Sequence, residues 1–365
     1  MSPLSYCVFL LQAATWTGAD VHLAADPLGD KSRDHWVERR CSAMGTGLRI
    51  EISAPTRALA LRASEVALRA VEACERRLST WDGNPDGELA RLNRAPVGQV
   101  VTLSEPLARE LTQALAWSRR TSGCFNPAVG PLVAAWDLRG EGRLPSGPDL
   151  QVALAHSSPA GFSLHGSHAI RTSPGLLLEE GGFGKGAGLD AALAALQETS
   201  MTAVRLDLGG QWLIASASAS PAPAHFAVAH PSHRDRSVLH LTMTSGSVAT
   251  SGNSERGIVV QGQRLGHLLD PATGRPARDF GSLTVLAPTA LAADALSTGL
   301  YVMGPEKAVE WCSRREGIEC LALVVTPEGL HALASPGLKE RIELCLPGLA
   351  IEFPAPLRSN FQATR

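Results

Sequence analysis

Apolar and polar residues follow two kinds of spacing in the first third of the chain. Residues 48–53 (LRIEIS) alternate apolar and polar side chains, which predicts a half-buried strand. Residues 57–79 and 107–120 carry apolar side chains at helical spacing, so each predicts an amphipathic helix. Ser104 stands just before the second of these segments and is expected to cap it.

The rest of the chain mixes strand and helix patterns in an irregular order. Helices are predicted over residues 187–198, 291–302 and 306–315, and strands over 176–182, 320–325 and 330–335, with further short strands within 203–230 and 236–286. Gly209-Gly210 predicts a turn, and the stretches 139–148 and 216–223 predict surface loops. This order, with room for antiparallel hairpins, indicates an α+β fold.

Composition and charge narrow the class of protein. The chain has 365 residues, of which 44% are hydrophobic and 19% charged, and this balance predicts a globular protein. The formal net charge of -2 and the lack of a long basic run argue against nucleic acid as a partner. The seven cysteines are scattered and include no CxxC pair, so we expect free thiols, or at most one disulfide, rather than a zinc site.

The expected organisation has three parts. Residues 1–40 read as a leader or disordered segment, because Tyr6–Ala14 is apolar but far too short to span a bilayer. Residues 41–335 form the main domain, or two intimately joined ones. Residues 336–365 are a C-terminal extension with no predicted role.

A glycine-rich turn is the sharpest local signal for chemistry. Residues 178–186 (LEEGGFGKG) stand between a predicted strand and a predicted helix. Glycines let backbone N–H groups approach an anion, the helix N-terminus adds partial positive charge, and Lys185 adds a full one. The turn therefore suits a phosphate or pyrophosphate, although a purely structural turn fits it equally well.

Three further segments carry candidate chemistry. Asp294 and Thr298 are four residues apart and share one helix face, where a carboxylate and a hydroxyl suit Mg²⁺; a solvated or capping pair is the alternative. His267 precedes the tight turn 270–276 and could accept a proton near neutral pH, unless it is incidental to the turn. Residues 247–256 (SVATSGNSER) suit either a ligand-lining strand end or an ordinary hairpin loop.

Taken together and in this order, these segments resemble the bacterial ApbE family, the FAD:protein FMN transferases. The matching pieces also include residues 43–46, 78–81, 88–93, 125–132, 208–210 and 287–298, so that the similarity runs over about residues 41–335. The resemblance implies an ApbE-like, T-fold-related fold of mixed sheets with flanking helices. It also implies an enzyme that binds FAD and Mg²⁺, joins FMN through a phosphoester to a Thr or Ser of a flavoprotein, such as one of a membrane redox complex, and releases AMP.

The resemblance carries roles to individual positions. His267 matches the residue that deprotonates the acceptor hydroxyl. The metal-binding positions are Asp294 and Thr298, with Ser297 adjacent and a backbone carbonyl from Gly182 or Gly184. The positions that match FAD contacts are Met44, Trp81, Ala128, Val129, Gly130, Glu179, Lys185 and Leu268.

The chain departs from the family pattern at several points. Glu179 and Asn126 stand where the family usually has Asp, residues 252–256 read GNSER rather than Gly-Asp-Tyr-Glu-Arg, and Phe183-Gly184 replaces the usual Ile-Ala. An FAD pyrophosphatase and a flavin-binding protein without turnover therefore remain alternatives. The resemblance favours the periplasmic side of the cell envelope, whereas a leader without a basic start leaves the cytoplasm open.

Overall fold

A computed structural model describes residues 34–81, 86–253, 257–260 and 262–354. Most of the predicted leader lies outside the described residues. The first strand of the described residues begins at His35, six residues before the predicted domain start, because residues 35–43 pair with the next strand. Within the described ranges, no helix is both long enough and apolar enough to cross a bilayer.

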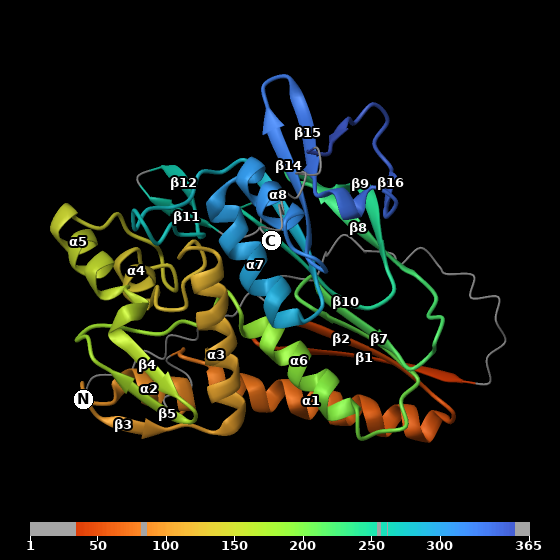
Figure 1. Cartoon of the computed structure of the whole chain (residues 1–365), viewed down its shortest axis with the longest axis horizontal. Coiled ribbons are helices and arrows are strands. Elements are labelled where there is room, and N and C mark those ends of the chain that lie inside the picture. Colours follow the sequence, from red (N-terminus) through yellow and green to blue (C-terminus); the bar gives the residue numbers. More distant parts are fainter. Residues whose placement is uncertain (1–33, 82–85, 254–256, 261, 355–365) are drawn as a thin grey trace, which may run out of the picture.

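A nine-stranded sheet forms the centre of the molecule (Figure 1). Its order is β1-β2-β6-β7-β10-β13-β14-β15-β17, and every pair is antiparallel except β15 with β17. The strands are β1 (His35–Ala43), β2 (Thr46–Ala54), β6 (Ala203–Leu208), β7 (Gln211–Ser216), β10 (Gly246–Gly252), β13 (Gly281–Ala287), β14 (Glu319–Thr326), β15 (Gly329–Ala334) and β17 (Ile351–Glu352).

Two of its hairpins close through two-residue turns with positive φ at both positions. The predicted turn at Gly209 and Gly210 joins β6 to β7, with φ of 60° and 83°. Met44 and Gly45 join β1 to β2, with φ of 50° and 71°. Turns of this left-handed kind match the twist of paired strands, and a non-glycine residue such as Met44 adopts them only at some cost.

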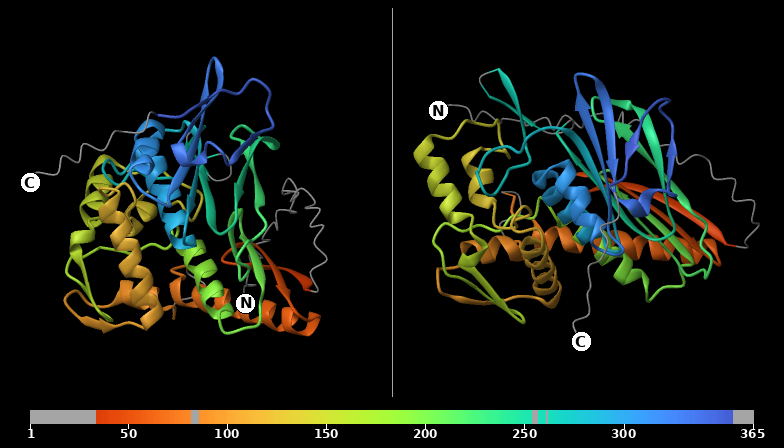
Figure 2. Two further views of the ribbon diagram at one scale, coloured as in Figure 1. Left: turned by 45° about the vertical axis from the view of Figure 1, so that its right-hand side comes forward. Right: turned by 45° about the horizontal axis from the view of Figure 1, so that its top comes forward.

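Helices cover one face of the large sheet, as the two views in Figure 2 show. Ile50 of β2 and Leu206 of β6 pack under the helices α1 (Arg57–Leu78) and α6 (Gly184–Leu196). Further along the sheet, β13 and β14 pack under α7 (Ala290–Met303) and α8 (Pro305–Ser313). The alternation of side chains along each strand puts these apolar residues on a single face.

A small sheet covers part of the opposite face. It consists of β8 (Ala224–His230), β9 (His233–Met243) and β16 (Ile342–Leu344), in the order β16-β9-β8. Trp212 of β7 and Phe226 of β8 meet edge to face with ring centroids 5.7 Å apart. Leu338 and Leu349 of the C-terminal extension are buried in the same cluster, so residues 336–354 belong to the folded core.

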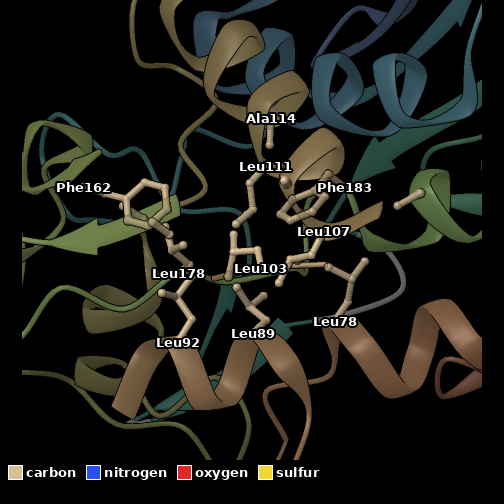
Figure 3. Packing of buried hydrophobic residues seen from close by; sticks show 14 of the residues in the cluster. Leu78, Leu89, Leu92, Leu103, Leu107, Leu111, Ala114, Phe162, Leu178 and Phe183 are labelled. Atoms are coloured by element: carbon tan, nitrogen blue, oxygen red, sulfur yellow. The ribbon is translucent and has the colours of Figure 1, made fainter. Parts of the chain in front are cut away.

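The other helices and strands form two groups, of which the first packs around the C-terminal end of α1 (Figure 3). Leu78 of α1 meets Leu89 and Leu92 of the next helix and Leu107 and Leu111 of the one after it in one buried cluster. The elements of this group are α2 (Glu88–Arg94), α3 (Glu105–Arg120), β3 (Val100–Thr102), β4 (Phe162–His165) and β5 (His168–Arg171). The second group packs in a separate buried cluster and consists of α4 (Gly130–Ala135), α5 (Gly147–His156), β11 (Gly257–Val260) and β12 (Gln263–Gly266).

The α+β prediction is confirmed, and so are the helices 57–79, 107–120, 291–302 and 306–315 to within a few residues. The predicted strand over 176–182 is wrong. Its backbone is satisfied by other partners, because the Asn93 side chain binds both the N–H and the C=O of Leu178, at 2.9 and 2.8 Å. The segment therefore runs on without joining a sheet.

Candidate functional site

The crossing of α6 and α7 positions the centre of the candidate site. A Cβ on Gly186 would lie 2.2 Å from the carbonyl oxygen of Ala290, so only glycine fits where the two helices touch. The side-chain amide of Gln211 donates to the same carbonyl at 2.8 Å. The glycine-rich turn and the predicted magnesium helix are thus brought face to face.

Asp294 is the buried carboxylate at this crossing. Its side chain is 5% exposed, and its two oxygens accept from Lys185 Nζ at 3.1 Å and from the Gly186 N–H at 3.0 Å. A buried carboxylate requires such partners. The N-terminus of α6 adds partial positive charge to the same place, so the turn and Lys185 both bring positive charge beside Asp294.

A second carboxylate fixes the same two helices from the other side. Asp190 of α6 accepts from the backbone N–H groups of Ala290 and Leu291, at 2.7 and 2.9 Å, where α7 begins. Burial raises the pKa of Asp190 to about 6, although these two N–H groups act against the shift. Each helix therefore supplies a carboxylate to the N-terminal turn of the other.

Thr298, which is one turn further along α7, lies next to Gly182 of the glycine-rich turn. From Ala290 to Tyr301, every residue of α7 is buried except Thr298. A Cβ on Gly182 would lie 3.5 Å from Thr298 Oγ1. The hydroxyl of Ser297, which was also predicted as a ligand, already donates to the Asp294 backbone carbonyl at 2.9 Å.

These donors fit a hard divalent cation. Asp294 offers a carboxylate, Thr298 a hydroxyl and Gly182 a backbone carbonyl, all oxygens of the type that Mg²⁺ prefers. The described residues contain no cluster of three or more His, Cys, Asp or Glu side chains suited to a metal. A single carboxylate agrees with an ion that keeps water and substrate phosphate among its ligands.

Met44 reaches this crossing from the tip of the β1–β2 hairpin. Cβ atoms built on Gly184 and Gly188 would lie 3.6 and 2.9 Å from the Met44 side chain. The half-buried thioether therefore covers the first turn of α6. The atoms nearest to a Cβ on Gly184 belong to Glu180 and Met44, whereas a Cβ on Gly182 lies beside Thr298.

Trp81 and Glu179 belong to a polar cluster at the start of the same glycine-rich turn. Trp81 is 52% exposed, and the guanidinium of Arg139 lies 4.7 Å from its ring centroid. Arg139 also pairs with Glu179 at 2.5 Å. Burial and the neighbouring Glu180 carboxylate raise the pKa of Glu179, and Arg139 acts against this shift.

The segment Ala128–Gly130 runs beside Glu179 and contributes backbone. The Glu179 N–H donates to the carbonyl of Pro127 at 2.8 Å, and a Cβ on Gly130 would lie 2.6 Å from that of Leu177. Ala128 is fully buried and Val129 half-buried. Asn126 explains one departure from the family pattern, because its amide donates to Ser157 and accepts from Ala128 N–H, and a carboxylate cannot do both.

His267 lies at the end of β12, between two fixed neighbours. Gly266 packs against the Asn253 side chain, to which a Cβ on this glycine would come within 2.4 Å. Asn253 in turn donates to the hydroxyl of Tyr301 on α7, at 3.2 Å. Leu268 is buried in the cluster that contains α7, so the half-exposed His267 is held near the C-terminal part of that helix.

Some residues of the site could not be recognised in the sequence. Arg139 lies in a Gly/Pro-rich stretch and gave no signal of its own, whereas Asp190 is the one acidic residue of α6, whose other residues apart from Lys185 are glycine or apolar, and this is a usable signal. Ser251 of β10 donates to Ser297 Oγ at 2.9 Å and lies in the small polar segment 247–256, of which residues 254–256 lie outside the described ranges.

Comparisons with known proteins find relatives over most of the chain. Residues 44–322 match the ApbE family. The FAD:protein FMN transferase of Klebsiella pneumoniae is 29% identical over 304 residues, which cover 80% of this chain and 85% of that protein. The FAD:protein FMN transferase of Vibrio cholerae is 26% identical over 337 residues, covering 91% and 96%.

Solved structures share the fold. The ApbE protein of Thermotoga maritima superimposes with a TM-score of 0.71 at 28% identity, over 85% of this chain and 97% of that one. The flavin transferase ApbE of Vibrio cholerae gives 0.70 at 24% identity, over 84% and 99%, and this match supports the fold alone. From the extent of the family match, the chain belongs to the ApbE family.

Proposed function

We propose that this chain is an FAD:protein FMN transferase. The observation that carries the proposal is the contact of Lys185 and the glycine-rich turn with Asp294 on α7, within a chain of the ApbE family. A cationic turn and hard oxygen donors suit the binding of a diphosphate with a divalent ion. The curated relatives that match most of the chain carry the same activity in their names.

The reaction joins FMN to a protein hydroxyl. The oxygen of an acceptor Thr or Ser attacks the phosphorus of the FMN half, the bond from that phosphorus to the AMP oxygen breaks, and AMP leaves. His267 takes the proton of the attacking hydroxyl, a contribution of about 10²–10⁴-fold for a placed base. Lys185 and the N-terminal turn of α6 bind and orient the diphosphate, which lowers the cost of bringing the reactants together.

Magnesium is the metal that the donors fit. Asp294, Thr298 and the Gly182 carbonyl would hold it, and when bound it neutralises charge on the phosphoryl oxygens. Met44, Trp81 and Glu179 would contact FAD, together with the backbone of residues 128–130 and Leu268. Because Leu268 is buried, its contribution is the shape of the wall beside His267.

The acceptor is a flavoprotein that exposes a Thr or Ser, and a membrane redox complex on the outer side of the cytoplasmic membrane is the class we propose. Localisation is tested by fractionating cells that express the full-length chain. Recovery in the periplasmic fraction supports this placement, and recovery in the cytoplasm contradicts it.

The function is tested by incubating the full-length protein with FAD and Mg²⁺, with and without a Thr-bearing acceptor. We expect AMP release that depends on the acceptor, and an FMN adduct on the acceptor by mass spectrometry. AMP and free FMN without an acceptor would instead identify an FAD pyrophosphatase. Tight FAD binding without any AMP would identify a flavin-binding protein and refute the transferase.

A further inference from the structure

We infer that Arg139 is the positioning residue that fixes Trp81 and Glu179 for recognition of FAD, an inference that rests on the proposed function. Arg139 lies in the turn after α4, in a stretch whose sequence predicts only a surface loop. Its side chain is 27% exposed, so it stands at the border of the site and not in the core.

The guanidinium joins two segments that lie far apart in the sequence. One terminal nitrogen donates to the backbone carbonyl of Thr80 at 2.8 Å. The other donates to Thr80 Oγ1 and to Glu179 Oε2, each at 2.5 Å. The planar fork of arginine reaches these acceptors together, which the single ammonium of lysine does not. Arg139 therefore sets the separation between the segment that ends at Trp81 and the glycine-rich turn.

The stacking of Arg139 on Trp81 determines which face of the indole stays open to a ligand. With Arg139 4.7 Å from the centroid, one face of the Trp81 ring is covered by a cation, while the side chain as a whole stays 52% exposed. An arginine over an aromatic face is held by electrostatic attraction. A flat ring, such as those of FAD, can then stack only on the opposite face.

The charged groups around Glu179 also indicate that Arg139 is the positioning residue. The adjacent Glu180 carboxylate accepts from Thr80 N–H and Oγ1, at 3.2 and 2.6 Å, and lies 3.7 Å from Arg139. Arg139 is thus the cation that both carboxylates contact. It opposes the rise in the pKa of Glu179 that burial and Glu180 cause, and so favours the carboxylate form, which accepts from N–H or O–H donors such as those on the edge of the bound ring or its sugar.

The loop that presents Arg139 is itself anchored at the site. Asp137 has a φ of 51°, a left-handed conformation that a non-glycine residue adopts only where its surroundings hold it. The indole N–H of Trp136 donates to the carbonyl of Gly274 at 2.7 Å, in the turn that follows His267. The same short loop therefore connects the Trp81–Glu179 cluster with the turn that carries the predicted base.

The test compares R139A and R139K with wild-type enzyme. We expect R139A to raise both the KM and the dissociation constant for FAD by about tenfold to a hundredfold, with kcat at saturating FAD within about threefold of wild type. R139K keeps the charge but lacks the fork, so it should stay at least about tenfold weaker in FAD binding. Its melting temperature should remain close to that of wild type, which separates recognition from folding.

Arg143 provides the matched control. It stands in the same loop but donates to the carbonyls of Ala134 and Ala135, at 3.1 and 2.8 Å. R143A should leave FAD affinity within about twofold of wild type. An R139A enzyme with unchanged FAD affinity, full rescue by R139K, or equal losses in R139A and R143A would each overturn the inference.

Binding and turnover are measured separately, so that the two proposals can fail separately. FAD affinity is measured by quenching of flavin fluorescence without an acceptor, and turnover by AMP release. Wild-type protein that binds FAD but releases no AMP would refute the transferase and still allow Arg139 to be tested through the affinity of its variants.

Discussion

At the scale of single residues, the site depends on one carboxylate with two sets of partners. Asp294 binds Lys185 and the Gly186 N–H, and the remaining lone pairs of its oxygens are those that a divalent ion would use. The rest of the predicted donors are neutral. We therefore expect the loss of the negative charge of Asp294 to weaken metal binding more than it lowers the stability of the fold.

D294N tests this separation. The amide keeps the shape and can still accept from Gly186, so the melting temperature should change little. The rate of AMP release at millimolar Mg²⁺ should fall by at least about 100-fold, because the ion loses its only proposed carboxylate ligand. Normal turnover in D294N, measured as a function of Mg²⁺ concentration, would show that the metal assignment is wrong.

The same scale shows where the sequence was informative. Asp294 and Thr298 could be predicted as a pair because helical spacing alone places them on one face, and Lys185 because glycines and a helix start surround it. Arg139 could not be predicted. Its partner Thr80 lies 59 residues away in the chain, and only the fold brings the two together.

At the scale of elements, the crossing of α6 and α7 leaves no room for a side chain. G186A places a Cβ 2.2 Å from the Ala290 carbonyl oxygen, which is backbone and cannot swing away. We expect the free energy of unfolding to fall by about 1–3 kcal/mol or more, as in other overpacked sites. Activity should fall with it, because Asp294 and Lys185 are separated.

Gly147 is the control for that substitution. It also lies in the first turn of a helix, α5, but a Cβ there meets nothing within 4 Å. Denaturant unfolding of G147A should give a stability equal to or slightly above that of wild type, because alanine loses less backbone entropy than glycine. Equal destabilisation of G186A and G147A would contradict the close crossing.

Asp190 makes the stability of the pair α6 and α7 depend on pH. Its pKa is about 6 in the folded protein against an ordinary value of 3.8, so the folded state binds the proton more tightly. Its contribution to stability is therefore largest below about pH 4, declines as the pH rises to about 6, and is constant above. In D190N this decline should be missing.

The comparison with D190N cancels the other titrating groups. Urea unfolding at pH 4.5 and pH 7 should show wild type gaining stability relative to D190N at the lower pH. If the unfolding free energies of wild type and D190N differed by the same amount at both pH values, the assignment of a raised pKa to Asp190 would be refuted.

Elements also show why part of the fold could not be predicted. The helices α2 and α4 are seven and six residues long, too short for a periodic pattern to identify them. The segment 176–182 was predicted as a strand because it begins with three leucines, yet the side chain of Asn93 in α2 binds the N–H and the C=O of Leu178 in place of a neighbouring strand. In both cases contacts that are distant in the sequence decide the local structure.

At the scale of the whole molecule, the C-terminal extension is part of the core. Leu338 is fully buried against the small sheet, and the Arg341 side chain donates to the Thr242 carbonyl of β9 at 2.9 Å. The similarity by which the sequence was interpreted ended near residue 335, so no role could be predicted for this segment. Its role in the structure is to close one edge of the apolar cluster beneath β8 and β9.

L338A measures that role. Removing a fully buried leucine side chain should cost about 2–5 kcal/mol in the free energy of unfolding. Leu344, in the same extension, is 49% exposed, and L344A should cost less than about 1 kcal/mol. Similar values for the two variants, measured by denaturant unfolding, would show that the extension is not packed as described.

The near-complete burial of α7 limits the positions at which this enzyme can accept substitutions. From Ala290 to Tyr301 only Thr298 escapes burial, so almost any substitution in this helix disturbs packing on several sides at once. Mutational libraries aimed at new acceptors should therefore leave α7 intact and vary exposed side chains elsewhere, such as those within residues 140–149.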